Sequence, residues 1–119
     1  MIKIGKNISS FSTYSCQPKT KEELIKIIKD RTLRSGGVFC DLNDIDTSLI
    51  TDMSYLFAQS NFNGNISEWD VSGCNLMCGM FAGSVFNGDI SKWNTSNVTD
   101  MKNMFAYSKF NGDISNWGI

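Results

Sequence analysis

Large apolar residues recur along this chain at a constant interval of 24 positions. One eight-residue segment occurs three times, as FNGNISEW at 62–69, FNGDISKW at 86–93 and FNGDISNW at 110–117. A constant period of this length is typical of proteins built from stacked repeats, in which each repeat packs mainly against its neighbours. The pattern therefore predicts a repeat solenoid with one turn per 24 residues.

A second apolar pattern within each repeat predicts a short helix. Met53, Leu56 and Phe57 follow the i, i+3, i+4 spacing of one helical turn, and the same spacing returns at 77–81 and 101–105. Such a turn places its three apolar side chains on one face, so we expect each to point into the core.

After the tryptophan of each repeat, the pattern changes to that of a strand. Residues 69–72 alternate between apolar and polar side chains, and stacked copies of such a segment would form a narrow parallel sheet. We therefore expect an α/β solenoid whose 24-residue turns each carry a short helix and a short parallel strand. Leu76 and Gly79 depart from the helical pattern, so the middle repeat should be the least regular.

A helix is also predicted upstream of the repeats. The segment TKEE at 20–23 is a capping box, and Leu24, Ile27 and Ile28 follow it at helical spacing, before Gly36 and Gly37 end the helix. We expect this amphipathic helix to cover the N-terminal end of the solenoid. A contact of its Lys and Arg face with a membrane surface or with nucleic acid is the alternative.

These elements predict a single domain with two parts. Residues 38–45 fit the columns of 62–69 with smaller apolar side chains, as expected of a terminal repeat. An N-terminal lead and capping helix (1–37) should thus precede a solenoid of nearly four repeats (38–119).

Charge is distributed unevenly between these two parts. The first 37 residues carry eight Lys or Arg and three acids, a net charge of +5, whereas the remaining 82 carry three Lys and nine acids, a net charge of −6. An acidic surface repels polyanions, so we do not expect the repeats to bind nucleic acid directly.

The sequence contains no run of eighteen apolar residues, and we expect no membrane span. Residues 1–16 share two lysines and a small residue before Cys16 with bacterial lipoprotein signals, but they lack the apolar core of a signal peptide. We interpret them as an ordinary N-terminal strand or tail. The lack of a clear signal favours a cytoplasmic location over the cell surface.

Candidate catalytic and metal sites are weak. The chain has no His, which excludes Ser–His and Cys–His nucleophile pairs. Asp41 begins a segment that resembles a calcium loop, but Ile45 occupies a ligand position. The four cysteines lack the close paired spacing of a zinc site, so we interpret them as free, mostly buried thiols, although a disulfide between Cys74 and Cys78 is geometrically conceivable. We expect no enzymatic activity, no metal and no cofactor.

The repeats resemble a known bacterial family. The pattern FNGDIS-x-W, followed by SNVTDM-x-x-MF at 96–105, is similar to the short repeats of BspA-like proteins, which are common in surface lipoproteins of mycoplasmas and other bacteria. The segments at 19–24 and 41–53 resemble the usual lead-in of that family, so the resemblance covers about residues 18–119. It implies a leucine-rich-repeat-like solenoid that serves as a binding or adhesion scaffold and carries no catalytic residues.

The predicted binding site consists of outward positions that differ between repeats, because invariant columns are needed for stacking. Three columns meet this description: Asp44/Glu68/Lys92/Asn116, Asp46/Asp70/Asn94 and Gln59/Gly83/Tyr107. The candidate site residues are Asp44, Asp46, Glu68, Asp70, Lys92, Asn94 and Tyr107. The four acids among them should form one patch for a basic protein partner, or else a merely solvated polar face.

The leading functional hypothesis is a non-catalytic protein-interaction module. One alternative is a small intracellular inhibitor or immunity-type protein, whose acidic surface occupies the nucleic-acid-binding groove of a basic partner. Another is an end-to-end homodimer, because no polar helix follows to cover the apolar residues of the last repeat, such as Met101 and Phe105.

Overall fold

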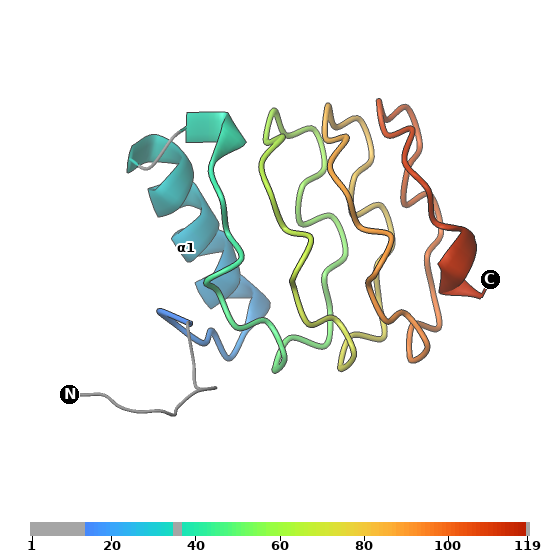
Figure 1. Cartoon of the computed structure of the whole chain (residues 1–119), viewed down its shortest axis with the longest axis horizontal. Helices are drawn as coiled ribbons and strands as arrows, with labels where there is room; N and C mark the ends of the chain where they lie inside the picture. Colours follow the sequence, from blue (N-terminus) through green and yellow to red (C-terminus); the bar gives the residue numbers. More distant parts are fainter. Residues whose placement is uncertain (1–13, 35–36, 119) are drawn as a thin grey trace.

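The chain forms one α-helix followed by a row of irregular coils (Figure 1). The computed structural model describes residues 14–34 and 37–118. In these ranges the elements are α1 (Lys21–Arg34) and two short 3₁₀ helices, η1 (Gly37–Phe39) and η2 (Ser115–Trp117). Downstream of η1 the coils lie side by side, with α1 at one end of the row and η2 at the other (Figure 1).

The helix α1 forms where the capping box predicts it. The Thr20 hydroxyl accepts a hydrogen bond from the Glu23 backbone N–H at 3.1 Å, and the Glu23 carboxylate accepts one from the Lys19 N–H at 2.8 Å. These bonds satisfy donors that a helix start otherwise leaves unpaired. Leu24 and Ile28 are buried against the coils, as the amphipathic pattern requires. Gly36, part of the predicted helix stop, and residues 1–13 of the predicted N-terminal strand or tail lie outside the described residues.

The predicted α/β solenoid of helix–strand turns is wrong. Among the described residues no strand and no sheet forms, and neighbouring coils share just four isolated parallel bridges: Cys16–Ile45, Asp41–Asn65, Asp52–Leu76 and Leu76–Asp100. The expected short helix at 53–57 and the expected strand at 69–72 are both absent. The radius of gyration, 14.5 Å, is close to the roughly 13.5 Å of a compact domain of this length, so the molecule is a small globule.

Overlapping turns replace the predicted helices. The N–H groups of Leu56, Ala58 and Ser60 each donate to the carbonyl three residues earlier, at 3.1–3.2 Å. Tyr55 and Gln59 sit at the third position of the turns 53–56 and 57–60 with φ of +59°, as a type II turn requires. A helix needs a negative φ at every residue, so these positions exclude it.

Neighbouring coils are joined by backbone hydrogen bonds at alternate residues. Each donor N–H in one coil points to a carbonyl of the next: Met53 to Leu76, Tyr55 to Cys78, Phe57 to Met80 and Gln59 to Ala82, at 2.8–2.9 Å. The same four bonds return 24 residues later, from 77–83 to 100–106. The coils thereby satisfy their buried backbone groups without a sheet.

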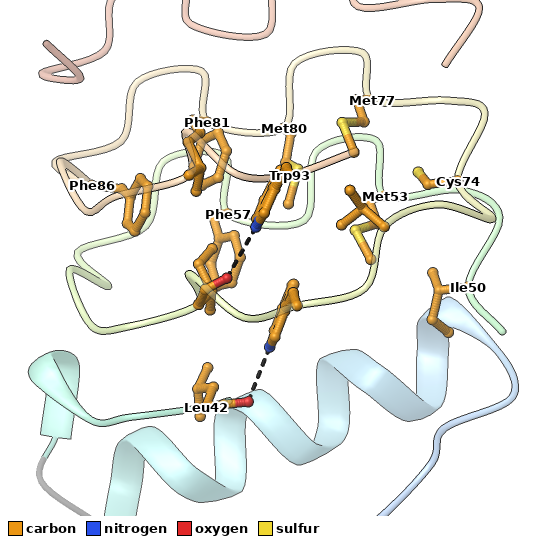
Figure 2. Packing of buried hydrophobic residues seen from close by; sticks show 14 of the residues in the cluster. Leu42, Ile50, Met53, Phe57, Cys74, Met77, Met80, Phe81, Phe86 and Trp93 are labelled. Carbon is orange, nitrogen blue, oxygen red and sulfur yellow. Dashed lines mark hydrogen bonds between the residues drawn. The ribbon is translucent and has the colours of Figure 1, made fainter. Parts of the chain in front are cut away.

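The core consists of aromatic rings stacked at the 24-residue period. Phe57 and Phe81 lie 5.6 Å apart between ring centroids, Phe62 and Phe86 6.2 Å, and Trp69 and Trp93 6.4 Å, each pair nearly parallel. Figure 2 shows Phe57 and Phe81 in adjacent coils and the indole N–H groups directed at backbone carbonyls. Each tryptophan donates to a carbonyl of the preceding coil at 3.0 Å: Trp69 to Leu42, Trp93 to Ile66 and Trp117 to Ile90.

The asparagine and glycine of each repeat also serve packing. Asn63 accepts from the Asn87 backbone N–H at 2.8 Å, and Asn87 accepts from that of Asn111 at 2.7 Å. A Cβ on Gly64 would lie 2.0 Å from the Cys40 carbonyl oxygen, so no larger residue fits there. The conspicuous repeated segment is therefore part of the scaffold.

Candidate interaction surface

Two outward surfaces are candidates for binding, and we name them by their columns. The acidic columns contain the predicted site residues Asp44, Glu68, Lys92, Asp46, Asp70 and Asn94. The turn strip contains the third positions of the type II turns, namely Tyr55, Gln59, Gly79, Gly83, Asn103 and Tyr107.

Asp44 is bound within the molecule. Its two carboxylate oxygens accept hydrogen bonds from the Arg31 guanidinium of α1, at 2.8 and 2.7 Å, and the Ser15 hydroxyl donates to the same group. The Arg31 hydrogen bonds lower the pKa of Asp44 from its ordinary value of 3.8 to about 2. Bidentate pairs of this kind are geometrically specific, so this carboxylate positions α1 against the coils.

Asp46 is also engaged internally. It accepts from the Gln17 side chain at 2.8 Å and from the Ser48 backbone N–H at 3.0 Å. Partial burial acts to raise the pKa of Asp46, but hydrogen bonds from Ser48 and Gln17 outweigh it and leave the pKa below 3.8. Both aspartates of the first acidic pair therefore hold the N-terminal segment in place.

The remaining residues of the acidic columns face solvent. Glu68, Asp70, Lys92 and Asn94 are all exposed. Asp70 accepts from the Ser72 backbone N–H at 3.0 Å, and Asn94 accepts from that of Ser96 at 3.1 Å, both within their own turns. The predicted acidic patch therefore consists of two different pairs. Asp44 and Asp46 are engaged within the molecule, whereas Glu68 and Asp70 are exposed and form no ion pair among the described residues.

The turn strip carries exposed side chains on strained backbone. Tyr55, Gln59, Asn103 and Tyr107 have φ between +56° and +59°, which costs an L-residue roughly 1–2 kcal/mol relative to glycine. Tyr107 is 98% exposed and Tyr55 is 63% exposed, so burial does not offset this cost.

The equivalent positions of the middle coil are glycines, and they lie beneath side chains of the preceding coil. A Cβ on Gly79 would lie 2.4 Å from the Tyr55 ring, and one on Gly83 would lie 2.5 Å from the Gln59 amide. Gly79, which the sequence pattern suggested would weaken a helix, instead adopts the left-handed conformation that this turn requires.

Sequence reasoning found the column of Tyr107 but missed the one that contains Tyr55 and Asn103. The available signal was the pair Gly79 and Gly83, four residues apart, because glycine at that spacing is typical of successive left-handed turn positions. This signal was missed because residues 77–81 were interpreted as a helix.

Cys16, Cys40, Cys74 and Cys78 are free thiols, and burial raises the pKa of Cys40 and Cys74, which makes these two less reactive. In ranges 14–34 and 37–118, no group of three or more His, Cys, Asp or Glu is arranged to hold a metal ion. A hollow of about 470 Å³ lies between Phe39 and Asp89 and is lined mainly by glycine, asparagine and serine.

No helix in the described part of the chain is long and apolar enough to cross a bilayer. A family model described as "Mycoplasma protein of unknown function, DUF285" matches residues 30–119. No curated protein and no solved structure matches the sequence.

Proposed function

We propose that this chain, which belongs to the DUF285 family of proteins of unknown function, is a non-catalytic protein-interaction module. The resemblance of its repeats to those of BspA-like proteins implies a binding or adhesion scaffold and supports the same proposal. The candidate binding surfaces are the turn strip and the exposed part of the acidic columns.

The observation that carries this proposal is the exposure of side chains on strained backbone. Strained residues persist where a function or the surrounding structure requires them, and they cluster at ligand-contacting sites. Glycine serves the fold equally well at Gly79 and Gly83, so Tyr55 and Tyr107 are not required for the turn itself. Exposed tyrosines among glycine and asparagine are also typical of protein-binding surfaces, because tyrosine supplies a large contact area at low entropic cost.

The acidic columns add a preference for a basic partner. Glu68 and Asp70 are exposed, and neither forms an ion pair within the described residues. Exposed charges of this kind raise the rate of association with an oppositely charged protein more than they raise its affinity.

The inhibitor alternative has less support. A surface that mimics nucleic acid needs a continuous row of free acids. Here Asp44 is neutralised by Arg31, and Asp46 is bound to Gln17 and Ser48. Of the four predicted acids, Glu68 and Asp70 alone remain available to a partner. We therefore prefer a general protein-binding surface to a phosphate mimic.

Affinity capture from the source cells, followed by mass spectrometry, tests the proposal. The wild-type chain should enrich a protein that the double variant Tyr55→Gly, Tyr107→Gly does not, while Glu68→Lys combined with Asp70→Lys should weaken capture most at low salt. Phe39→Ala is the matched control, because Phe39 is an exposed aromatic (71%) outside the turn strip. Equal enrichment by the wild type and the double-tyrosine variant would contradict the assigned surface.

A further inference from the structure

The asparagine column of the repeats has an aromatic residue in its first coil. At the 24-residue interval, Phe39 takes the place of Asn63, Asn87 and Asn111. The side chains of Asn63 and Asn87 each accept a hydrogen bond from the next coil, at 2.8 and 2.7 Å, whereas the backbone N–H of Asn63 donates to the Val38 carbonyl at 2.7 Å. The Phe39 side chain therefore contributes nothing to the hydrogen bonds that join the coils.

Packing does not account for the Phe39 side chain either. It is 71% exposed, and it is not among the apolar residues of the described chain that pack on the core. Exposure alone does not make a binding site, because single exposed apolar residues are common on protein surfaces. The evidence for a site comes from the groups that surround this residue.

Phe39 borders the hollow of about 470 Å³ described above, which we name the Phe39 hollow. This volume lies within the roughly 300–1,000 Å³ of small-molecule sites. A Cβ on Gly64 would lie 2.0 Å from the Cys40 carbonyl oxygen, and one on Gly88 would lie 2.8 Å from the Phe86 ring, so the packing of the coils keeps both positions free of a side chain. The remaining lining residues are Asn63, Asn65, Ser67 and Asp89.

Two residues of the Phe39 hollow each have one side-chain atom that serves the fold and one that is free. Asn65 Oδ1 accepts from the Ser67 backbone N–H at 3.0 Å, and Asp89 Oδ1 accepts from that of Ser91 at 2.9 Å. Asn65 Nδ2 and Asp89 Oδ2 have no hydrogen-bond partner within ranges 14–34 and 37–118. Because these residues occupy the same position of adjacent coils, the hollow presents an amide donor beside a carboxylate acceptor.

We propose that the Phe39 hollow binds a neutral saccharide. The slightly positive C–H groups on one face of a pyranose ring pack on the negative face of the Phe39 ring. One sugar hydroxyl donates to Asp89 Oδ2 and another accepts from Asn65 Nδ2, since each hydroxyl can do either. None of these residues belongs to the acidic columns or the turn strip, so the proposal does not depend on the protein-binding surface.

Other ligand classes fit this lining less well. Phosphate and sulfate are held by Lys, Arg or helix N-termini, and none of the lining residues is basic. A calcium ion needs several oxygen ligands, usually with more than one carboxylate, and Asp89 supplies the single carboxylate of the lining. A peptide is anchored by side chains in desolvated apolar pockets, whereas four of the seven lining residues are polar.

A glycan array tests the proposal with the full chain. The probes are immobilised neutral oligosaccharides, with sialylated and sulfated oligosaccharides on the same array. We expect the wild-type chain to bind at least one neutral oligosaccharide, and titration with that compound should shift the NMR signals of the Phe39, Asn65 and Asp89 amides. Phe39→Ala should weaken this binding at least about fivefold, whereas Phe39→Trp, which keeps an aromatic face, should retain it.

Two substitutions separate the free polar atoms from those that serve the fold. Asn65→Asp and Asp89→Asn both keep an oxygen for the backbone N–H that each side chain already binds, but the first removes the free donor and the second replaces the free acceptor with a donor. Each should weaken saccharide binding at least about threefold without lowering the melting temperature. Asp113→Asn is the matched control, because Asp113 accepts from the Ser115 N–H in the same way at 2.9 Å but does not line the hollow.

Other results would overturn the proposal. If the wild-type chain binds no neutral oligosaccharide, or binds only the sialylated or sulfated ones, the assigned ligand class is wrong. Equal binding by the wild type, Phe39→Ala and Asn65→Asp would place the saccharide elsewhere on the chain. Loss of capture of an unglycosylated protein by Phe39→Ala would identify this residue as a protein contact, because capture through Tyr55 and Tyr107 does not use the hollow.

Discussion

The acidic columns and the turn strip are both outward surfaces, but their side chains affect the stability of the fold differently. Asp44 of the acidic columns stabilises the fold, whereas Tyr107 of the turn strip destabilises it. On the acidic columns, Asp44 holds α1 through Arg31, so its removal destabilises the fold. On the turn strip, Tyr107 lies on left-handed backbone that glycine adopts without steric strain, so its replacement by glycine should stabilise the fold. Surface position alone therefore does not show whether a residue serves the fold or a partner.

The largest effect is expected for Asp44→Ala. The substitution leaves the Arg31 guanidinium half-buried without its bidentate partner, and we expect a loss of about 2–3 kcal/mol in the free energy of unfolding. Urea denaturation measures it, with Glu68→Ala as the exposed acidic control. A loss below about 0.5 kcal/mol would remove the contrast between the two surfaces.

Gly79→Ala should cost about 2 kcal/mol, because it adds left-handed strain and brings Cβ against the Tyr55 ring. In a Tyr55→Gly background the contact is gone and the cost should fall to about 1 kcal/mol. A double-mutant cycle measures this coupling. Additive effects of the two changes would mean that the Tyr55 ring does not constrain Gly79.

Acid should weaken the fold through Asp44. Because its pKa is lowered from 3.8 to about 2, its contribution is complete above pH 3.8 and is lost as the pH falls from 3.8 to about 2. Allowing for solvent screening of a carboxylate that is about one-third exposed, we expect a loss of roughly 1 kcal/mol.

Thermal unfolding between pH 5 and pH 2 measures this dependence. Asp44→Asn should remove that part of the slope while leaving the remaining acid dependence of the protein in place. An identical slope in the variant would assign the acid sensitivity to other carboxylates.

Tyr107→Gly should stabilise the protein by about 0.5 kcal/mol, which is the relief of left-handed strain less the backbone entropy of glycine. Tyr107→Ala, which removes the side chain but keeps the strain, should leave the stability unchanged. Calorimetry of the two variants separates these contributions, and equal stabilities would mean that the backbone at this position is not strained.

The smallest effect is expected for Glu68→Lys combined with Asp70→Lys. Both side chains are exposed, so the free energy of unfolding should change by less than about 0.5 kcal/mol. A loss above 1 kcal/mol in urea would show that these acids, like Asp44, serve the fold. The acidic columns would then have no free part for a partner.

Part of the fold could be predicted from particular residues. The recurrence of Phe and Trp every 24 positions identified the rings that stack, because identical side chains in register pack on one another. The segment TKEE located the start of α1, because its capping contacts are local. The candidate site was recovered in part: Glu68, Asp70, Lys92, Asn94 and Tyr107 are exposed, whereas Asp44 and Asp46 are engaged internally.

The helices and strands were predicted wrongly for a definite reason. Successive turns with bonds between residues i and i+3 share the i, i+3, i+4 apolar spacing of a helix, so the pattern of Met53, Leu56 and Phe57 does not separate the two. The sign of φ at Tyr55 and Gln59 does separate them. Among the three copies, the glycines of the middle coil and Asn103 of the last coil carry that information in the sequence, because both residue types favour a positive φ.

The sequence by itself determined the period of the repeats, the ring columns and the start of α1, because each depends on side-chain identity at short or constant spacing. Only the tertiary structure decided the conformation of the coils and the pairing of Asp44 with Arg31 rather than with a partner. Backbone N–H groups that bond to the next coil hold left-handed residues in place, and Arg31 reaches Asp44 across 13 residues from a different element. Such contacts depend on how separate segments meet in space, which no local pattern specifies.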